Sequence, residues 1–157
     1  MSVLLLRLSG PMQSWGVQSR FTVRDTGLEP SKSGVVGLIA AAMGRPRHAD
    51  IGDLAGLRMA VRVDREGILK QDYHTAQNVL RAKSGLKDTE LSWRYYLADA
   101  CFLVARQGPA ALLESAQRAL RNPRWAIFLG RRAFPPGEPV WLADGLQPQQ
   151  EIAQAIR

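Results

Sequence analysis

The pattern of apolar and polar positions along the chain predicts strands that alternate with helices. Unbroken apolar runs, or apolar residues at every second position, indicate strands, whereas apolar residues three and four positions apart indicate helices. Strands are expected at residues 3–8, 59–65, 95–106 (with a bend at Asp99) and 140–142.

Two long helices are expected between these strands. The first is capped by Ser31 or Ser33 and ends at Gly44, and the second follows Pro109. Shorter helical stretches are expected at residues 50–57 and 148–157. Gly34 and Gly37 each cost the first helix about 1 kcal/mol of propensity relative to alanine. Such a cost predicts that another backbone, a strand or a ligand approaches the helix closely there.

The order of these elements predicts the fold class. Residues 68–74 are expected to pair with strand 59–65 as a hairpin, and residues 75–93, which show no sustained period, to protrude as an insertion. The remaining order is βαββαβ, which predicts an α+β, ferredoxin-like fold, the frame that RNA-recognition modules also use. The length of 157 residues is that of a single domain, so residues 1–157 are expected to form one unit.

A long polar loop joins the first strand to the first helix and is the main candidate for binding. Loops of this length are uncommon unless they are functional. Basic side chains attract phosphates, an indole can stack on a base, and a helix start favours anions. The loop and the helix start supply such groups at Gln13, Ser14, Trp15, Arg20, Arg24, Lys32 and Ser33.

Two alternatives stay open for this loop. Trp15 is as well suited to plug the core as to stack on a base. Lys32 and Ser33 resemble the end of a phosphate-binding loop, but the full motif needs glycine where Thr26 and Ser31 stand. A nucleotidase is therefore not expected, while anion binding at the helix start remains open.

The charge balance favours a nucleic-acid partner. The chain has 21 basic and 14 acidic residues, a formal net charge of +7, and 17 of the bases are arginine. Arginine forks match phosphate oxygens and stack on bases, although a basic surface without a partner is the alternative. Further candidates lie in the insertion and near the last strand: Arg81, Lys83, Lys87, Arg131 and Arg132. The first three suit either contact with nucleotides or a solvated hairpin. The last two suit RNA or acids of a neighbouring subunit.

Other classes of function find little support in the sequence. The single cysteine, Cys101, permits no disulfide within the chain, and the apolar run at the start is too short for a membrane span. These features predict a cytoplasmic protein. His48, His74 and Cys101 are far apart in sequence, so neither a metal site nor a cofactor is expected.

His74 is the one residue that favours an enzymatic alternative. With Tyr73 and Lys70 nearby it could serve metal-independent RNA cleavage. A structural His74, hydrogen-bonded at the base of the insertion, is the other interpretation.

Several segments resemble one known family. LRLSGPMQSWG at residues 6–16 and PSKSGVVGLIAAAMG at residues 30–44 resemble the CasD-type subunit of the type I-E CRISPR surveillance complex, Cascade, within the RAMP superfamily. Three shorter motifs are similar in the same order: DYHT at 72–75, SWRYYLADACF at 92–102 and LGRR at 129–132. The resemblance covers the chain from end to end.

This resemblance implies a non-catalytic RNA-binding subunit of a ribonucleoprotein complex in antiviral defence. Family members bind and cap the repeat-derived 5′ handle of CRISPR RNA. They also contact the repeated backbone subunit (CasC type) and the large subunit (CasA type), and through the latter meet target DNA indirectly. Their projecting thumb corresponds to residues 75–93 here, with His74 at its base. Family members usually extend several tens of residues beyond the GRR loop, whereas this chain stops at Arg157, as a truncated or unusually short member would.

Overall fold

A four-stranded antiparallel sheet forms the frame of the molecule. The computed structural model describes residues 1–18 and 21–157. The strands are β1 (Ser2–Ser9), β4 (Arg58–Arg65), β7 (Cys101–Gly108) and β8 (Trp141–Pro148), in the order β4-β7-β1-β8. β1 pairs with β7 from Ser2–Gly108 to Ser9–Cys101. Three of the four strands expected from the apolar pattern are present, and the last of them is longer than residues 140–142. The expected strand 95–106 is divided: residues 95–98 end β6 (Leu86–Ala98), which lies in a second sheet, and the rest belongs to β7.

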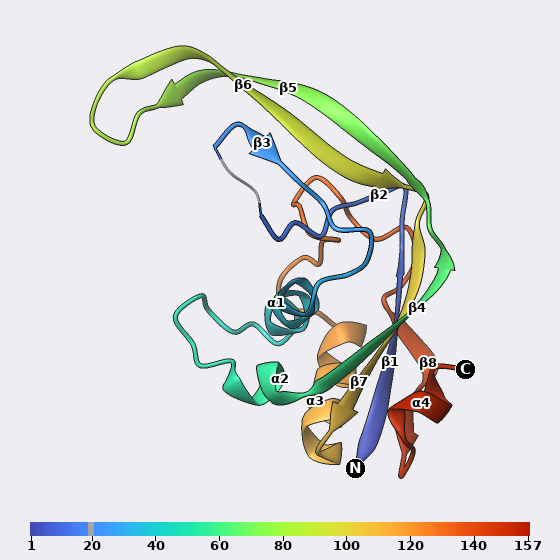
Figure 1. The fold of residues 1–157 in the computed structure, drawn as a ribbon. Helices are drawn as coiled ribbons and strands as arrows, with labels where there is room; N and C mark the ends of the chain where they lie inside the picture. Colours follow the sequence, from blue (N-terminus) through green and yellow to red (C-terminus); the bar gives the residue numbers. More distant parts are fainter. Residues whose placement is uncertain (19–20) are drawn as a thin grey trace.

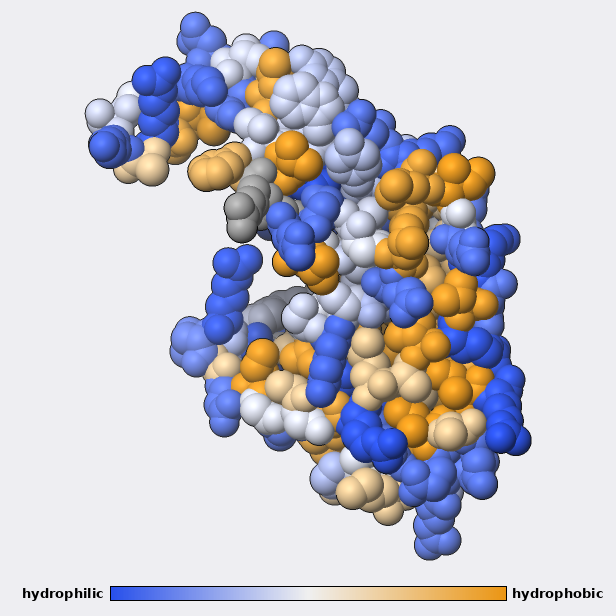
Figure 2. All heavy atoms as spheres, viewed as in Figure 1, coloured by the Kyte–Doolittle hydropathy of each residue, from blue (hydrophilic) through white to orange (hydrophobic). Residues whose placement is uncertain are grey.

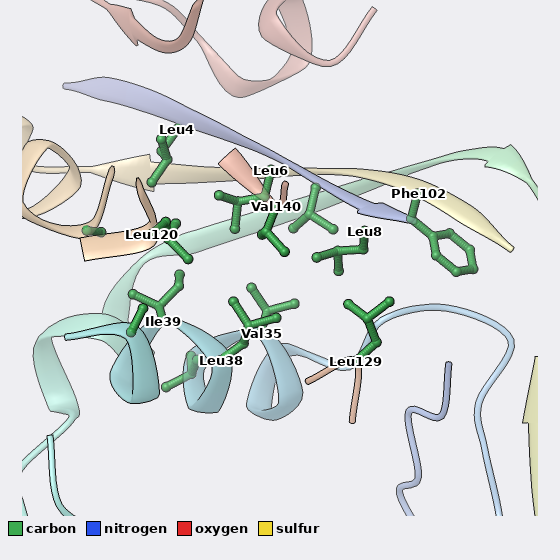
Figure 3. Packing of buried hydrophobic residues seen from close by; sticks show 14 of the residues in the cluster. Leu4, Leu6, Leu8, Val35, Leu38, Ile39, Phe102, Leu120, Leu129 and Val140 are labelled. Atoms are coloured by element: carbon green, nitrogen blue, oxygen red, sulfur yellow. The ribbon is translucent and has the colours of Figure 1, made fainter. Parts of the chain in front are cut away.

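Helices cover both faces of this sheet. α1 (Lys32–Ala42), α2 (Gly52–Gly56) and α3 (Ala110–Arg121) lie on one face, and α4 (Ile152–Ala155) lies on the other (Figure 1). β1 is apolar at successive positions because it is buried on both faces. Leu4, Leu6 and Leu8 point toward α1 (Figure 3), whereas Val3 and Leu5 pack with Ile152 of α4.

A second sheet is built on a long hairpin that projects from the first (Figure 1). Its strands are β5 (Ile68–Leu80) and β6 (Leu86–Ala98), and the short strands β2 (Met12–Gln13) and β3 (Val23–Arg24) pair with β6. The first loop is thereby attached to the hairpin at two points. β3 runs parallel to β6, with Val23 opposite Trp93 and Arg24 opposite Arg94.

The hairpin corrects two expectations. Residues 68–74 do not pair with strand 59–65: β5 pairs with β6 along its whole length, and β4 pairs with β7. Residues 75–93 are regular strands with a turn between them, not an aperiodic segment. The alternation was not visible because most of their side chains are exposed on both faces of the hairpin, so no buried face imposes a period of two. The expected bend at Asp99 is confirmed by its φ of 57°, between β6 and β7.

The ends of α1 follow the expected residues. Ser31 is the N-cap, and its Oγ accepts a hydrogen bond from the Gly34 N–H at 3.2 Å. Ser33 is the second residue of the helix and does not cap it. Gly44, with φ of +71°, follows the C-cap Met43.

Arg106 of β7 is a charged residue inside the core. Its side chain is 0% exposed, and its Nη2 donates to the carbonyl of Leu54 in α2. Its Nε and Nη1 have no hydrogen-bond partner among residues 1–18 and 21–157. Burial lowers the pKa of the Arg106 guanidinium to about 10, because a low-dielectric site disfavours the charged form.

Replacing this cation should stabilise the fold. We expect Arg106→Met to raise the free energy of unfolding at pH 7 by about 2 kcal/mol, because a side chain of similar length removes the desolvation cost. The folded state loses its proton at a lower pH than the unfolded state, so the wild type gains stability as pH rises above about 10. Urea unfolding at pH 7 and pH 11 measures both effects. A variant less stable than the wild type at pH 7 would show that the bond to Leu54 outweighs the buried charge.

No helix among residues 1–18 and 21–157 is long and apolar enough to cross a membrane.

Candidate nucleic-acid interface

The first loop is fixed to the core by the side chain of Gln13. Its Nε2 donates to the carbonyls of Leu8 and Ala100 at 3.0 and 2.8 Å, and its Oε1 accepts from the Trp15 Nε1 at 3.2 Å. Gln13 and Trp15 are 0% and 1% exposed. The indole is thus part of the core, and the expectation that Trp15 stacks on a base is wrong for this conformation. The alternative, an aromatic plug, is what the structure shows, and the Gln13 amide is likewise occupied inside the protein.

Trp15 also explains one of the two glycines of α1. A Cβ at Gly34 would lie 2.8 Å from Cε3 of the Trp15 ring, closer than real Cβ contacts come. Close approach is confirmed at Gly34, although the partner is a side-chain ring and not a backbone, strand or ligand, and the same expectation is wrong at Gly37. A Cβ at Gly37 would meet nothing within 4 Å, so Gly37 leaves open space beside the helix.

The backbone of Ser14 joins the first loop to the loop that holds Arg131. The Ser14 N–H donates to the Leu129 carbonyl at 3.1 Å, and its Oγ lies 3.3 Å from the carbonyls of Asp25 and Tyr95. Gly130 has φ of +93° and lies against the Ser14 carbonyl. Ser14 therefore acts as a structural joint between β6 and both loops, and its hydroxyl is not free to read a ligand.

Three arginines gather where these segments meet. Arg24 of β3, Arg94 of β6 and Asp72 of β5 form one row across the second sheet. Arg131 donates to the carbonyls of Arg24 and Asp25 at 3.1 and 3.4 Å. Its pKa is lowered by burial first and then by the charges of Arg94 and Arg24. The arginine cluster, defined as Arg24, Arg94 and Arg131, thus brings like charges close together, and the carboxylates of Asp25 and Asp72 partly offset their effect on the pKa of Arg131.

Arg94 is a candidate that the sequence analysis did not select. Its Nε donates to the Ser92 Oγ at 2.9 Å, and this bond orients the guanidinium. Knowledge of the strand register would have revealed it, because a residue opposite Arg24 on the same face joins its cluster. Because residues 75–93 were interpreted as aperiodic, the register that places Arg94 opposite Arg24 could not be inferred from the sequence.

His74 lies on the same face of the hairpin as Arg94. It is opposite Ser92 and two positions from Asp72, and it is partly buried. Its Nδ1 is buried and makes no hydrogen bond within the described part of the chain. The structure therefore places His74 beside the arginine cluster and leaves the His74 Nδ1 without a hydrogen bond from the described residues.

The start of α1 borders a small hollow next to this cluster. The hollow has a volume of about 230 Å³ and is lined by Ser14, Trp15, Gly16, Ser31, Ser33, Gly34 and Gly130. Lys32 and Ser33 are exposed there. Figure 2 shows the molecule hollowed between the projecting hairpin and the part that carries α1.

Other candidates lie apart from the cluster. Arg81 and Lys83 are exposed at the hairpin turn, and Lys87 forms an ion pair with Glu90. Arg132 is exposed and lines a groove beside α1. Arg20 lies outside the described residues. Within the described ranges, no three His, Cys, Asp or Glu side chains gather as a metal ion would require.

A family model and a relative of known name match this chain. The model of the family described as CRISPR-associated protein (Cas_Cas5) matches residues 3–155. The CRISPR system Cascade subunit CasD of Escherichia coli (strain K12) is 37% identical over 159 residues, which cover 90% of this chain and 70% of that protein.

Two solved structures are also similar. A Cas protein crystal structure is 49% identical with a TM-score of 0.78, covering 98% of this chain and 68% of that one. A chain of a CRISPR RNA-guided surveillance complex is 41% identical with a TM-score of 0.82, covering 90% of this chain and 64% of that one. This chain spans between 64% and 70% of the length of these relatives.

The chain belongs to the CRISPR-associated Cas_Cas5 family. The resemblance to CasD-type subunits stated from the sequence motifs is thereby confirmed. The mixed α+β class with antiparallel sheets is confirmed as well.

Proposed function

We propose that this chain is a non-catalytic, RNA-binding subunit of a CRISPR surveillance complex and that it holds the 5′ handle of CRISPR RNA. Its similarity to the Cascade subunit CasD and to a chain of an RNA-guided complex supports the setting. The observation that carries the RNA-binding part is the arginine cluster, in which Arg24 and Arg94 pair across the second sheet and Arg131 donates to the Arg24 carbonyl. Guanidinium forks bind phosphate oxygens in pairs of hydrogen bonds, which suits contact with an RNA backbone.

The fold that we infer for this function is ferredoxin-like, with the β5–β6 hairpin as its thumb. The sheet order β4-β7-β1-β8 supports it, because the βαββαβ elements are β1, α1, β4, β7, α3 and β8. In this assignment residues 1–157 are one domain, and the thumb extends beyond residues 75–93 to the whole hairpin. Its charged inner side, with Arg94 and His74, faces the loop of residues 129–134, as the ring contact of Tyr96 with Phe134 at 5.9 Å supports.

The remaining partners belong to the same proposal. We infer contacts with a CasC-type backbone subunit and a CasA-type large subunit, and an indirect role at target DNA. Specificity for the handle would come from unpaired bases read on their edges, as is usual for single-stranded RNA. Phosphate contacts alone position the strand without reading its sequence.

A gel assay tests this function directly. The purified chain is mixed with 5′-labelled RNA that carries a repeat-derived handle, without added metal and over a series of salt concentrations. We expect a shift without cleavage, stronger for the handle than for a scrambled RNA of equal length, and weaker as salt rises. A chain that shifts neither RNA at low salt would contradict the proposal.

A metal-independent endoribonuclease is the second candidate, because the buried Nδ1 of His74, beside the arginine cluster, has no hydrogen-bond partner in the part of the chain that the structure describes. This alternative expects discrete cleavage within the repeat and its loss in His74→Ala. The proposed function expects no product from either protein. The same gel separates the two.

A further inference from the structure

A groove follows α1 away from the arginine cluster. The α1 groove has a volume of about 890 Å³ and is lined by one side of α1, the segment after it and residues between 124 and 132. Its lining residues are Gly37, Ala40, Ala41, Arg45, Pro46, Arg47, Ile51, Arg124, Trp125, Ala126, Phe128 and Arg132.

The groove is continuous with the site already described. A smaller hollow of about 370 Å³ shares Gly37, Ala41 and Phe128 with the α1 groove. It shares Ser33 and Gly130 with the hollow at the start of α1. A continuous path thus leads from Gly130, the neighbour of Arg131 in sequence, past the start of α1 to the α1 groove.

The walls of this groove suit a flat aromatic ligand. Trp125 is 45% exposed although it is a large apolar side chain. Across the groove, α1 presents Gly37 and Ala41, and a Cβ at Gly37 would meet nothing within 4 Å. Exposed indole on one wall and a nearly bare helix surface on the other leave a slot in which a ring can stack.

The charges around the slot suit phosphate. Arg47, Arg124 and Arg132 line the groove, and no carboxylate of the described chain does. Arg45 also lines the groove, but its guanidinium is already paired with the Asp53 carboxylate through two contacts of 2.6 Å. Arg124 is placed by the backbone: its N–H donates to the Ala42 carbonyl at 2.9 Å, and its side chain crosses Gly44.

We propose that the α1 groove is a nucleotide site in which one unpaired RNA base stacks on Trp125. Arg47, Arg124 and Arg132 neutralise the phosphates on either side of that base. Continuity with the arginine cluster favours RNA over an acidic peptide, because a strand held at Arg131 enters the groove without leaving the surface. This inference rests on the proposed function and adds a site that the cluster alone does not require.

Fluorescence of 2-aminopurine tests the site. The probe is the handle RNA with 2-aminopurine at one position at a time, bound to the purified chain, since stacking on an indole quenches this base. We expect quenching beyond that of free RNA at a single position, relieved in Trp125→Leu, together with about 10-fold weaker binding. Trp93→Leu is the matched control, because Trp93 is exposed on the hairpin face opposite Arg94, and it should leave both readings unchanged.

The outcomes separate this inference from the proposed function. RNA that binds with equal affinity to both tryptophan variants, with no quenching that depends on Trp125, overturns the nucleotide site and leaves the proposed function standing. Loss of a partner subunit from the complex of Trp125→Leu, with RNA binding intact, identifies a protein interface and also overturns it. A wild-type chain that binds no RNA contradicts both proposals. Arg47→Gln, which leaves the slot intact, should lower the salt dependence of binding by about 0.7 in slope and provides a second test.

Discussion

Gly130→Ala is expected to cost at least about 4 kcal/mol in the free energy of unfolding. Two terms add at this position. The φ of +93° is one that residues with a Cβ rarely adopt, which costs about 1–2 kcal/mol. The added Cβ would also lie 1.7 Å from the Ser14 carbonyl oxygen, a contact with backbone that no rotamer change relieves. Relief requires the loop to move, which breaks the hydrogen bond from the Ser14 N–H to Leu129.

Gly85→Ala is the matched control for this prediction. Gly85 has φ of +80° at the hairpin turn, but a Cβ there meets nothing within 4 Å. Its cost should therefore be the backbone term alone, about 1–2 kcal/mol. Urea unfolding of the two variants compares them, and equal costs would show that the contact with Ser14 is unimportant. Because the Gly130 loop carries Arg131, the first variant should also bind RNA less well where it remains folded.

This joint between Ser14 and Gly130 shows what the sequence could not reveal. The apolar pattern was sufficient to predict β1, α1, β4, β7 and α3, because each has one or two buried faces that impose its period. The contact of Gly130 with Ser14 joins residues more than a hundred positions apart. The local sequence does not distinguish a glycine required by the backbone conformation of a turn from a glycine required because a carbonyl distant in sequence lies close to it.

The candidate binding residues also divide into those whose role the sequence could indicate and those whose role it could not. Arg24 and Arg131 were selected from charge and motif, and the structure brings them together. Gln13, Ser14 and Trp15 were selected from the same first loop as Arg24, but their polar atoms are used inside the protein. A motif marks positions that matter without separating residues that build a site from residues that touch its ligand. Burial distinguishes the two kinds of residue here, because the buried Trp15 supports the site. The exposed Trp125 was not selected from the sequence, because no motif contains it.

The double variant Arg24→Gln/Arg94→Gln is expected to bind handle RNA about 10- to 100-fold more weakly near 0.1 M salt. Each guanidinium that contacts a phosphate contributes about 0.7 to the salt slope for a single strand. The slope should therefore fall by about 1.4 while the fold stays intact, because both side chains are at least partly exposed. Arg131 is left in place because it also donates to the carbonyls of Arg24 and Asp25.

The control pair Arg118→Gln/Arg157→Gln removes the same net charge elsewhere. Arg118 lies on α3 and Arg157 at the end of the chain, and both are exposed. A long-range effect of the +7 charge would weaken RNA binding similarly in both double variants. Local contacts would weaken only the first, since exposed charges beyond a Debye length of about 10 Å at 0.1 M salt are largely screened. Equal losses in the two variants would therefore show that the chain attracts RNA through its overall charge, and the arginine cluster would lose its role as the specific grip.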